Sequence, residues 1–394
     1  MSELLPVAEA QARLLAAAPA LSTETLPLAD AIGRWAAVPL IARRTQPERD
    51  LSAMDGYAVR FGDLPGPMRV IGESAAGRPF AGAVKAGQAT RIFTGAAVPE
   101  GADTVMVQEE ARRDGDTLWL DGEGPAREGA NIRRRGLDFA DGDTLVAAGE
   151  RLTPARLAVA ATGGLGDVTV RRRVRVAIAA TGDELVEPGR AVEPGRLPES
   201  NRLLLRALLA DLPVEIIDLG ILPDRLEPLT DTFRHVAADV LVTTGGASVG
   251  DHDLVRPALQ AAGAAIDFWR IALRPGKPLM AGWRGDMAVL GLPGNPVSAF
   301  VTGLLFVKPM VAALAGAAQP LPQTTTGILG EALPANGPRT DYLRAELRDG
   351  RAYVATIQDS SMLRTLARAG CLVVRQPHAP AAAMGDSAEI LVIA

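Results

Sequence analysis

The 394-residue sequence has few of the side chains that disulfides and soft metals require. It contains one cysteine, Cys371, so no disulfide can form within the chain, and its three histidines disfavour a zinc site of Cys and His ligands. Aromatic residues make up 4%, and 41 basic against 46 acidic residues give a net charge of −5. Nucleic-acid-binding proteins usually combine a basic surface with stacking aromatics, so this class is also disfavoured. Any bound metal is expected to be a hard cation with oxygen ligands.

The sequence also lacks a basic, apolar signal peptide and a long hydrophobic run. The first 20 residues carry Glu3 and no basic segment, which is typical of an amphipathic helix. The most apolar stretch, residues 299–307, stops at Lys308 and Pro309. It is too short to span a bilayer and predicts a buried helix. We therefore expect a cytoplasmic protein with neither a membrane nor a nucleic acid as partner.

The central part of the chain, residues 174–318, alternates between strand and helix patterns. Strands are predicted at 174–180, 214–220, 239–244, 265–273 and 287–292, and helices at 200–212, 225–237, 253–263 and 295–316. This order predicts an α/β unit with a mainly parallel sheet covered on both faces.

The flanking parts of the chain have β-rich patterns. Residues 43–142 contain four Asp-Gly pairs, at 55–56, 114–115, 121–122 and 141–142, a dipeptide common in tight hairpin turns. Residues 342–357 alternate around Asp349 and Gly350, which predicts another hairpin near the end of the chain. The length allows two to four domains.

Charged residues follow the predicted strands of the α/β unit, where ligands of such sheets bind. The loops carry Asp183 and Glu184, then Asp224, then Asp251 and Asp253 within TTGGASVGDHD (243–253), then Arg274 and Lys277, and finally Asn295, a predicted N-cap before Pro296. Glycine-rich junctions and helix N-termini bind phosphate, which carboxylates alone would repel. A magnesium ion between phosphate and carboxylates resolves this conflict. The rim therefore predicts a phosphate and magnesium site.

Each of these signals has a simpler structural explanation. The glycine-rich segment fits neither the P-loop nor the dinucleotide-binding pattern, and Asp253 could cap the following helix. Asp224 is a common type of turn residue, and exposed Arg and Lys often only solvate a surface. Their convergence on one edge of a sheet favours a site without identifying its substrate.

Seven segments taken together resemble the MoeA family of molybdopterin molybdenumtransferases, to which the gephyrin E domain is related. They are DLSAMDGYAVR (50–60), TGAAVPEGADTVMVQEE (94–110), IRRRGLDF (132–139), ATGDELVEPG (180–189), TTGGASVGDHD, LRPGKPL (273–279) and GLPGNPVSAF (291–300). The combination covers nearly the whole chain and is specific in this order.

The resemblance implies a multidomain α/β protein that forms elongated homodimers. It assigns residues 1–22 and 174–318 to a three-layer αβα molybdopterin-binding domain, 23–42 and 143–173 to a small linking domain, 43–142 to a β-rich arm, and 319–394 to a C-terminal β-barrel. In this family the active cleft lies between the α/β domain of one subunit and the arm of the other.

The resemblance also implies the reaction, a magnesium-dependent insertion of molybdate into adenylated molybdopterin with release of AMP, as a step of molybdenum cofactor biosynthesis. Other molybdenum cofactor enzymes are candidate partners. The implied catalytic residues are Asp55, Asp138, Glu184, Asp253, Arg270 and Arg274, and the implied metal ligands are Asp224 and Asp253. The implied substrate-binding residues are Thr181, Gly245, Gly246, Ser248, Gly250, Lys277, Pro293, Asn295, Ser298, Arg344 and Ser360.

This sequence departs from the family pattern at three positions. Arg270 and Arg274 stand where some relatives carry lysine, and Asp359 stands where glycine is common before Ser360. Arginine keeps the positive charge but presents a planar fork of donors. Because the chain lacks soft thiolate ligands, the sulfurs for molybdenum would come from the dithiolene of the substrate.

Two other functions share parts of this pattern. A molybdopterin adenylyltransferase would have a similar α/β domain and TTGG loop, but it would not need the β-rich arm. A non-catalytic carrier or scaffold for the pterin is the second alternative. The five matched carboxylates favour an enzyme.

Overall fold

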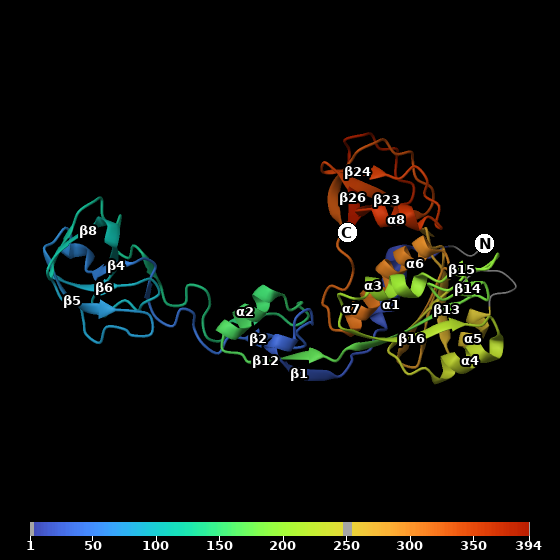
Figure 1. Ribbon diagram of the computed structural model, residues 1–394, viewed down its shortest axis with the longest axis horizontal. Helices are drawn as coiled ribbons and strands as arrows, with labels where there is room; N and C mark the ends of the chain where they lie inside the picture. Colours follow the sequence, from blue (N-terminus) through green and yellow to red (C-terminus); the bar gives the residue numbers. More distant parts are fainter. Residues whose placement is uncertain (1–3, 247–253, 394) are drawn as a thin grey trace.

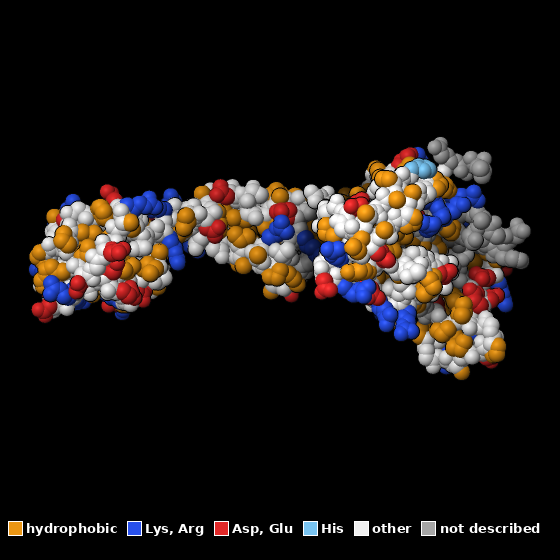
Figure 2. All heavy atoms as spheres, turned by 90° about the horizontal axis from the view of Figure 1, so that it is seen from above, with side chains coloured by type: hydrophobic (Ala, Val, Ile, Leu, Met, Phe, Trp, Pro, Cys, Tyr) orange, Lys and Arg blue, Asp and Glu red, His pale blue; other side chains and the backbone are white. Residues whose placement is uncertain are grey.

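The computed structural model describes residues 4–246 and 254–393 and has an elongated shape. Figure 1 shows a β-rich arm at one end, a narrow linking region in the middle, and an α/β unit with a neighbouring β-barrel at the other end. Figure 2 shows acidic and basic side chains scattered over all these parts on the visible face, without one large patch of a single sign.

The α/β unit is built on one six-stranded sheet with the order β16-β13-β17-β21-β20-β18. Its strands are β13 (Val174–Thr181), β16 (Val214–Leu222), β17 (Val240–Thr244), β18 (Ala265–Arg270), β20 (Pro278–Arg284) and β21 (Met287–Leu292). β13, β16, β17 and β21 pair in parallel, which confirms the predicted mainly parallel sheet.

Strand β20 was not predicted from the sequence. It begins at a proline and pairs antiparallel with both β21 and β18. Its connection to β21 is a two-residue turn in which Gly285 has a positive φ of 57°. The segment therefore forms a hairpin inserted into an otherwise parallel order, a feature that the alternation of strands and helices does not reveal.

Helices cover both faces of this sheet, so the predicted three-layer αβα arrangement is confirmed. One face packs against α1 (Val7–Ala16), α3 (Asn201–Leu208), α6 (Pro296–Thr302) and α7 (Lys308–Leu314), and the other packs against α4 (Leu226–His235) and α5 (Val255–Ala261). Alternate residues of β13 point to opposite faces of the sheet. Val176 and Ile178 belong to the core beneath α1, α3, α6 and α7, and Ala177 belongs to the core beneath α4 and α5.

The final helix of the unit contains a π-helical turn, Gly303–Val307, between α6 and α7. Pro309 has no N–H to donate to the Leu305 carbonyl four residues earlier. Gln11 of α1 donates its Nε2 to this carbonyl over 2.8 Å, which ties the N-terminal helix to the core. The helix 296–314 as a whole is long and apolar enough to cross a membrane, but 83% of it is buried within the protein. The predicted buried helix is thus confirmed, with a greater length than the apolar run alone indicates.

The arm has its own six-stranded sheet with the order β7-β4-β6-β5-β9-β8. Its strands are β4 (Gly56–Val59), β5 (Met68–Ser74), β6 (Gln88–Ile92), β7 (Thr104–Val107), β8 (Ala111–Asp114) and β9 (Thr117–Leu120). The Asp-Gly pair at 114–115 lies at the β8–β9 hairpin, as predicted, although Gly115 and Asp116 form the two-residue turn. The pair at 55–56 instead opens β4 and is not a hairpin turn.

The linking region consists of two short strand pairs and one helix. β1 (Thr23–Pro27) pairs with β12 (Asp167–Arg171), and β2 (Leu40–Ile41) pairs with β11 (Thr144–Val146). Helix α2 (Pro154–Thr162) starts after Thr153, whose hydroxyl accepts the Arg156 N–H over 3.3 Å. The region therefore combines segments from both sides of the arm in the sequence.

The C-terminal strands close into a five-stranded barrel because β23 pairs with both β24 and β25. The strands are β22 (Thr325–Leu329), β23 (Thr340–Arg348), β24 (Arg351–Val354), β25 (Cys371–Arg375) and β26 (Ser387–Val392). Asp349 and Gly350 form the β23–β24 turn with positive φ angles of 48° and 73°, which confirms the predicted hairpin. The short strand β19 (Leu273–Arg274) of the central unit pairs with β23. The exact domain boundaries remain a prediction.

Candidate functional site

A cavity of about 710 Å³ lies at the edge of the central sheet where its parallel strands end. It is bordered by the last residues of β13 and β17, by the residues that follow β21, and by the N-termini of α3 and α6. Residues predicted from the sequence that line it are Thr181, Glu184, Asp224, Gly245, Gly246, Pro293 and Asn295. The convergence of the strand-end loops on one site is therefore observed.

The glycines after β17 allow the backbone to approach β13 closely. Gly245 has a φ of 87°, and a Cβ added to it would lie 2.3 Å from the Thr181 carbonyl oxygen. A side chain at this position would need the backbone to move. The Thr181 Oγ1 beside it is buried and has no hydrogen-bond partner in the part of the chain that the structure describes.

The charged side chains that line the cavity, among the described residues, are all carboxylates: Glu184, Glu199 and Asp224. Burial raises the pKa of Asp224 above its usual value, and the nearby charges of Asp183 and Glu184 raise it further. The Asp224 N–H donates to Asp183 Oδ1 over 3.3 Å. A bound cation would relieve the repulsion between these carboxylates.

No group of three or more His, Cys, Asp or Glu side chains lies close enough to hold a metal within 4–246 and 254–393. The carboxylates at the cavity nevertheless fit magnesium, which is usually held by one or two carboxylates together with substrate phosphates and water. The donor set therefore fits an ion that binds together with a phosphate ligand.

Helix α3 contributes residues that the sequence analysis did not identify. Glu199 is buried and accepts the N–H groups of Asn201 and Arg202 over 2.6 and 3.1 Å, so its carboxylate caps the helix. Asn201 Nδ2 donates to the Gly294 carbonyl over 2.7 Å and joins α3 to the loop before α6. The position of Glu199 directly before the predicted helix 200–212 is the local signal that could have indicated this cap.

The start of α6 is confirmed, but its predicted cap is wrong in one respect. Asn295 occupies the N-cap position and Pro296 the first turn, yet the Asn295 side chain makes no capping bond. Its Nδ2 donates to Ser360 Oγ over 3.0 Å, and the Val297 N–H donates to the Ser360 carbonyl over 3.1 Å. Ser360 of the barrel region therefore satisfies the helix end, because this region docks onto α6.

The barrel region also forms one wall of the cavity. Ser361 and Leu363 line it, and Ser361 donates its N–H and hydroxyl to Asp359 Oδ1 over 2.8 and 2.6 Å. Arg344 is buried, and its guanidinium donates to Gln358 Oε1 and the Met362 carbonyl over 3.2 Å each. Arg344 therefore fixes the segment that carries Ser360 and Ser361, and it does not itself line the cavity.

The predicted basic residues do not line this cavity. Arg274 forms an ion pair with the buried Asp341 of β23, and Lys277 is exposed. Ser298 is buried on α6, where its carbonyl accepts the Thr302 hydroxyl, and it does not line the cavity either. Arg270 is half-buried at the end of β18. The predicted residues Ser248, Gly250, Asp251 and Asp253 lie outside the described residues.

The two predicted carboxylates of the arm lie far from the cavity within one chain, since arm and α/β unit occupy opposite ends of the molecule (Figure 1). Asp55 Oδ1 accepts the N–H and hydroxyl of Thr94 over 2.7 and 2.8 Å, and these bonds lower its pKa. Asp138 is exposed. A single chain therefore does not bring Asp55 and Asp138 to Glu184 and Asp224.

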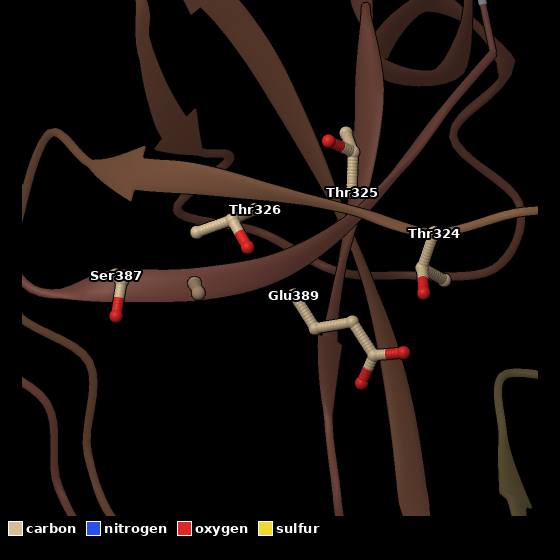
Figure 3. A pocket seen from close by; sticks show the side chains of 6 residues that line it. Thr324, Thr325, Thr326, Ser387 and Glu389 are labelled. Carbon is tan, nitrogen blue, oxygen red and sulfur yellow. The ribbon is translucent and has the colours of Figure 1, made fainter.

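A second pocket, of about 240 Å³, lies on the barrel between β22 and β26. Figure 3 shows that threonine and serine hydroxyls and the carboxylate of Glu389 surround it. It has no glycine-rich junction after a parallel strand, so it lacks the feature of the larger cavity that suits a phosphate. The larger cavity at the sheet edge is the better candidate site.

Comparisons with known proteins agree with this architecture in every part of the chain. Residues 5–164 match the MoeA N-terminal region (domain I and II), residues 177–313 a probable molybdopterin binding domain, and residues 326–393 the MoeA C-terminal region (domain IV). The chain is 35% identical over 398 residues to a molybdopterin molybdenumtransferase of Haemophilus influenzae, with 98% of each chain covered. It is 37% identical over 309 residues to the Nostoc sp. protein of that name, with 75% of this chain and 70% of the other covered.

A solved structure shows the same similarity in three dimensions. The molybdopterin biosynthesis MoeA protein of Pyrococcus horikoshii superposes with a TM-score of 0.83 at 27% identity, over 99% of this chain and all of the other. Sequence and fold thus agree over the arm, the α/β unit and the barrel. The chain therefore belongs to the MoeA family of molybdopterin molybdenumtransferases, which are transferase enzymes of molybdenum cofactor biosynthesis.

Proposed function

We propose that this protein inserts molybdate into adenylated molybdopterin and releases AMP in a magnesium-dependent reaction. The observation that carries the proposal is the cavity at the sheet edge, where the glycine junction after β17, suited to phosphate, adjoins Glu184, Glu199 and Asp224. Phosphate and carboxylates share such a site only with a cation between them.

The backbone around Thr181, Gly245 and Gly246, together with Ser248 and Gly250, would hold the phosphates. Pro293, Asn295, Ser298 and Ser360 would shape the substrate site at the start of α6, and Arg344 would act by fixing the Ser360 segment. Asp224 and Asp253 are the proposed magnesium ligands. When bound, magnesium would offset the negative charge of the phosphates.

The cationic residues Arg270, Arg274 and Lys277 would bind molybdate and stabilise negative charge that develops on the oxyanion. They stand on β18, on β19 and in the loop that follows, beside the same sheet edge. The dithiolene of the substrate would supply the sulfur ligands of molybdenum, which this chain does not offer. Glu184 remains a proposed catalytic carboxylate.

The separation of the arm from the cavity supports a homodimer in which each site takes Asp55 and Asp138 from the second chain. The arm projects away from its own α/β unit, so an antiparallel partner could place its arm there (Figure 1). Closed two-fold dimers are the commonest symmetric assemblies. We further propose that the protein acts in the cytoplasm and passes its product to molybdenum cofactor enzymes.

The two alternative functions are not favoured. An adenylyltransferase would account for the α/β unit but not for the arm and the barrel, both of which match MoeA regions. A pure carrier would not need the carboxylates that border the cavity.

The reaction is tested by mixing purified protein with adenylated molybdopterin, Mg²⁺ and molybdate and measuring AMP by chromatography. We expect AMP release that depends on both molybdate and Mg²⁺. Consumption of ATP with release of pyrophosphate would instead show an adenylyltransferase, and binding without either reaction would show a carrier.

The metal ligands are tested by Asp253→Asn and Asp224→Asn in the same assay. Each variant should fold normally and lose at least about tenfold in magnesium-dependent turnover, because one ligand of the ion is lost. Asp121→Asn, the same change in the arm, is the matched control. Activity near wild type in both site variants would contradict the proposed metal role.

A further inference from the structure

A strap of residues 183–198 runs from the end of β13 to the start of α3 along the cavity. Its two ends pair as the short parallel strands β14 (Leu185–Val186) and β15 (Leu197–Pro198). The Leu197 N–H donates to the Glu184 carbonyl over 2.9 Å, and the Arg196 guanidinium donates to the Asp183 carbonyl. Leu185, Leu197 and Pro198 line the cavity, and Leu197 is 58% exposed.

The strap is attached to helix α3 by one arginine. Both oxygens of Glu187, on the strap, accept Arg202 Nη2, over 2.6 and 2.7 Å. Arg202 is only 6% exposed, and its other donors bind Asp218 Oδ1 over 2.6 Å and Glu199 Oε2 over 3.1 Å. One buried guanidinium therefore connects the strap, the cap of α3 and strand β16.

The two sides of this network differ in exposure. The Glu187 side chain is 51% exposed, whereas Glu199 is 3% exposed and Asp218 is 34% exposed. Loss of Arg202 would leave the buried Glu199 without its charged partner, which is strongly destabilising. Loss of Glu187 would leave Arg202 paired to two carboxylates. The Glu187 contact can therefore be broken without unpairing the buried charges.

We propose that Arg202 is a positioning residue that holds the strap across the cavity through Glu187, so that Leu185, Leu197 and Pro198 form an apolar wall against a planar heterocyclic ring of the substrate. This inference rests on the proposed function, whose substrate carries two such rings, adenine and pterin. Apolar side chains suit the face of such a ring. The other apolar residues of the lining, Pro278, Pro293, Pro296 and Leu363, belong to segments outside the strap.

The contact between Glu187 and Arg202 is tested by trypsin cleavage after Arg190 and Arg196, two exposed arginines of the strap. Glu187→Gln removes the ion pair, and we expect cleavage about fivefold faster than in wild type, the change that corresponds to loss of about 1 kcal/mol. Glu193→Gln is the matched control, since it makes the same charge change on the same strap away from Arg202, and it should be cleaved like wild type. Glu187→Asp keeps the charge and should restore part of the protection.

Equal cleavage rates of Glu187→Gln and Glu193→Gln would overturn the proposal that the contact between Glu187 and Arg202 holds the strap. A circular dichroism melt shows that the digestion is run well below the unfolding transition of each variant, and mass spectrometry of the fragments locates the cleavage. Faster cleavage of Glu187→Gln throughout the chain, instead of after Arg190 and Arg196, would also overturn it.

The wall is tested by repeating the digestion of wild-type protein with AMP or with free pterin. Protection by AMP would place the adenine ring against the strap, and protection by pterin would place the pterin ring there. Protection by neither would overturn the wall. Failure of the proposed reaction can be told apart, since the digestion needs no turnover. If Glu187→Gln is cleaved faster as expected but the wild type releases no AMP in the activity assay, only the proposed reaction is contradicted.

Discussion

At the scale of single residues, Asp239 stabilises the central sheet at the end opposite the cavity, where it directly precedes β17. Its side chain is 9% exposed and accepts Arg172 Nη1 and Nη2 over 2.6 and 2.7 Å and the Arg175 N–H over 2.8 Å. Burial opposes ionisation of Asp239, but these bonds outweigh it and lower the pKa of this carboxyl below its usual value. The central sheet, which positions the cavity, is thus stabilised by Asp239, a charged residue outside the cavity.

Asp239→Asn should lower the free energy of unfolding by about 2 kcal/mol, because hydrogen bonds to a charged group are lost. The pKa is lowered in the folded state, so the unfolded state binds more protons between the two pKa values, and stability rises with pH in that window. In urea unfolding, the wild type should have the full contribution of ionised Asp239 to the free energy of unfolding above about pH 4 and should lose it below that pH. The free energy of unfolding of the variant should lack this decrease at low pH.

The control for this prediction is Asp231→Asn, which removes an exposed carboxylate beside His235 and should change stability by less than about 0.5 kcal/mol. Equal stability of Asp239→Asn and wild type at neutral pH would contradict the anchoring role.

Single residues of the site could be predicted only where a strand end precedes them. Thr181, Glu184, Asp224 and Gly245 follow strands of a parallel sheet, and such loops meet at one edge whatever their spacing in sequence. Glu199 and Ser361 depend instead on how α3 and the barrel dock, which no local pattern encodes. The buried state of Arg344 was missed for the same reason.

At the scale of elements, the contact between α1 and the π-helical turn compensates for Pro309. Gln11→Leu should lower the free energy of unfolding by about 1–3 kcal/mol, because the buried Leu305 carbonyl loses a donor. Pro309→Ala restores a backbone N–H at this point of the helix, so it should recover much of that loss in the double variant. Urea unfolding of the four proteins gives the coupling energy.

Strictly additive effects of these two substitutions would contradict the compensation. The helix itself could be predicted from its apolar pattern, but the close packing of Gly303, in the π-helical turn, against Leu205 and Leu208 could not. Strand β20 and the closure of the barrel likewise depend on pairing between distant segments.

At the scale of the whole molecule, the arm and the cavity lie too far apart to act within one chain (Figure 1). The sequence pattern alone indicates a β-rich segment, but it contains no information about the direction in which the arm projects. Only the resemblance to a family implied a site shared between subunits.

The proposed sharing of the site between two subunits predicts complementation between inactive chains. Asp55→Asn and Asp224→Asn should each retain a tenth or less of the activity alone, as expected above for Asp224→Asn, whereas mixed dimers would contain one site with both carboxylates intact. Random mixing in equal amounts after mild denaturation and refolding should restore about a quarter of wild-type AMP release, since half of the dimers are mixed and each has one intact site. No recovery, with mixed dimers verified by mass spectrometry, would contradict the shared site.

The proposed reaction requires a divalent ion between the substrate phosphate and the carboxylates at the sheet edge. The most direct test is the anomalous diffraction of Mn²⁺ in crystals of the protein with AMP. We expect a peak at coordination distance, about 2.1 Å, from an Asp224 oxygen and from an AMP phosphate oxygen. A phosphate bound in the cavity with no ion near Asp224 would contradict it.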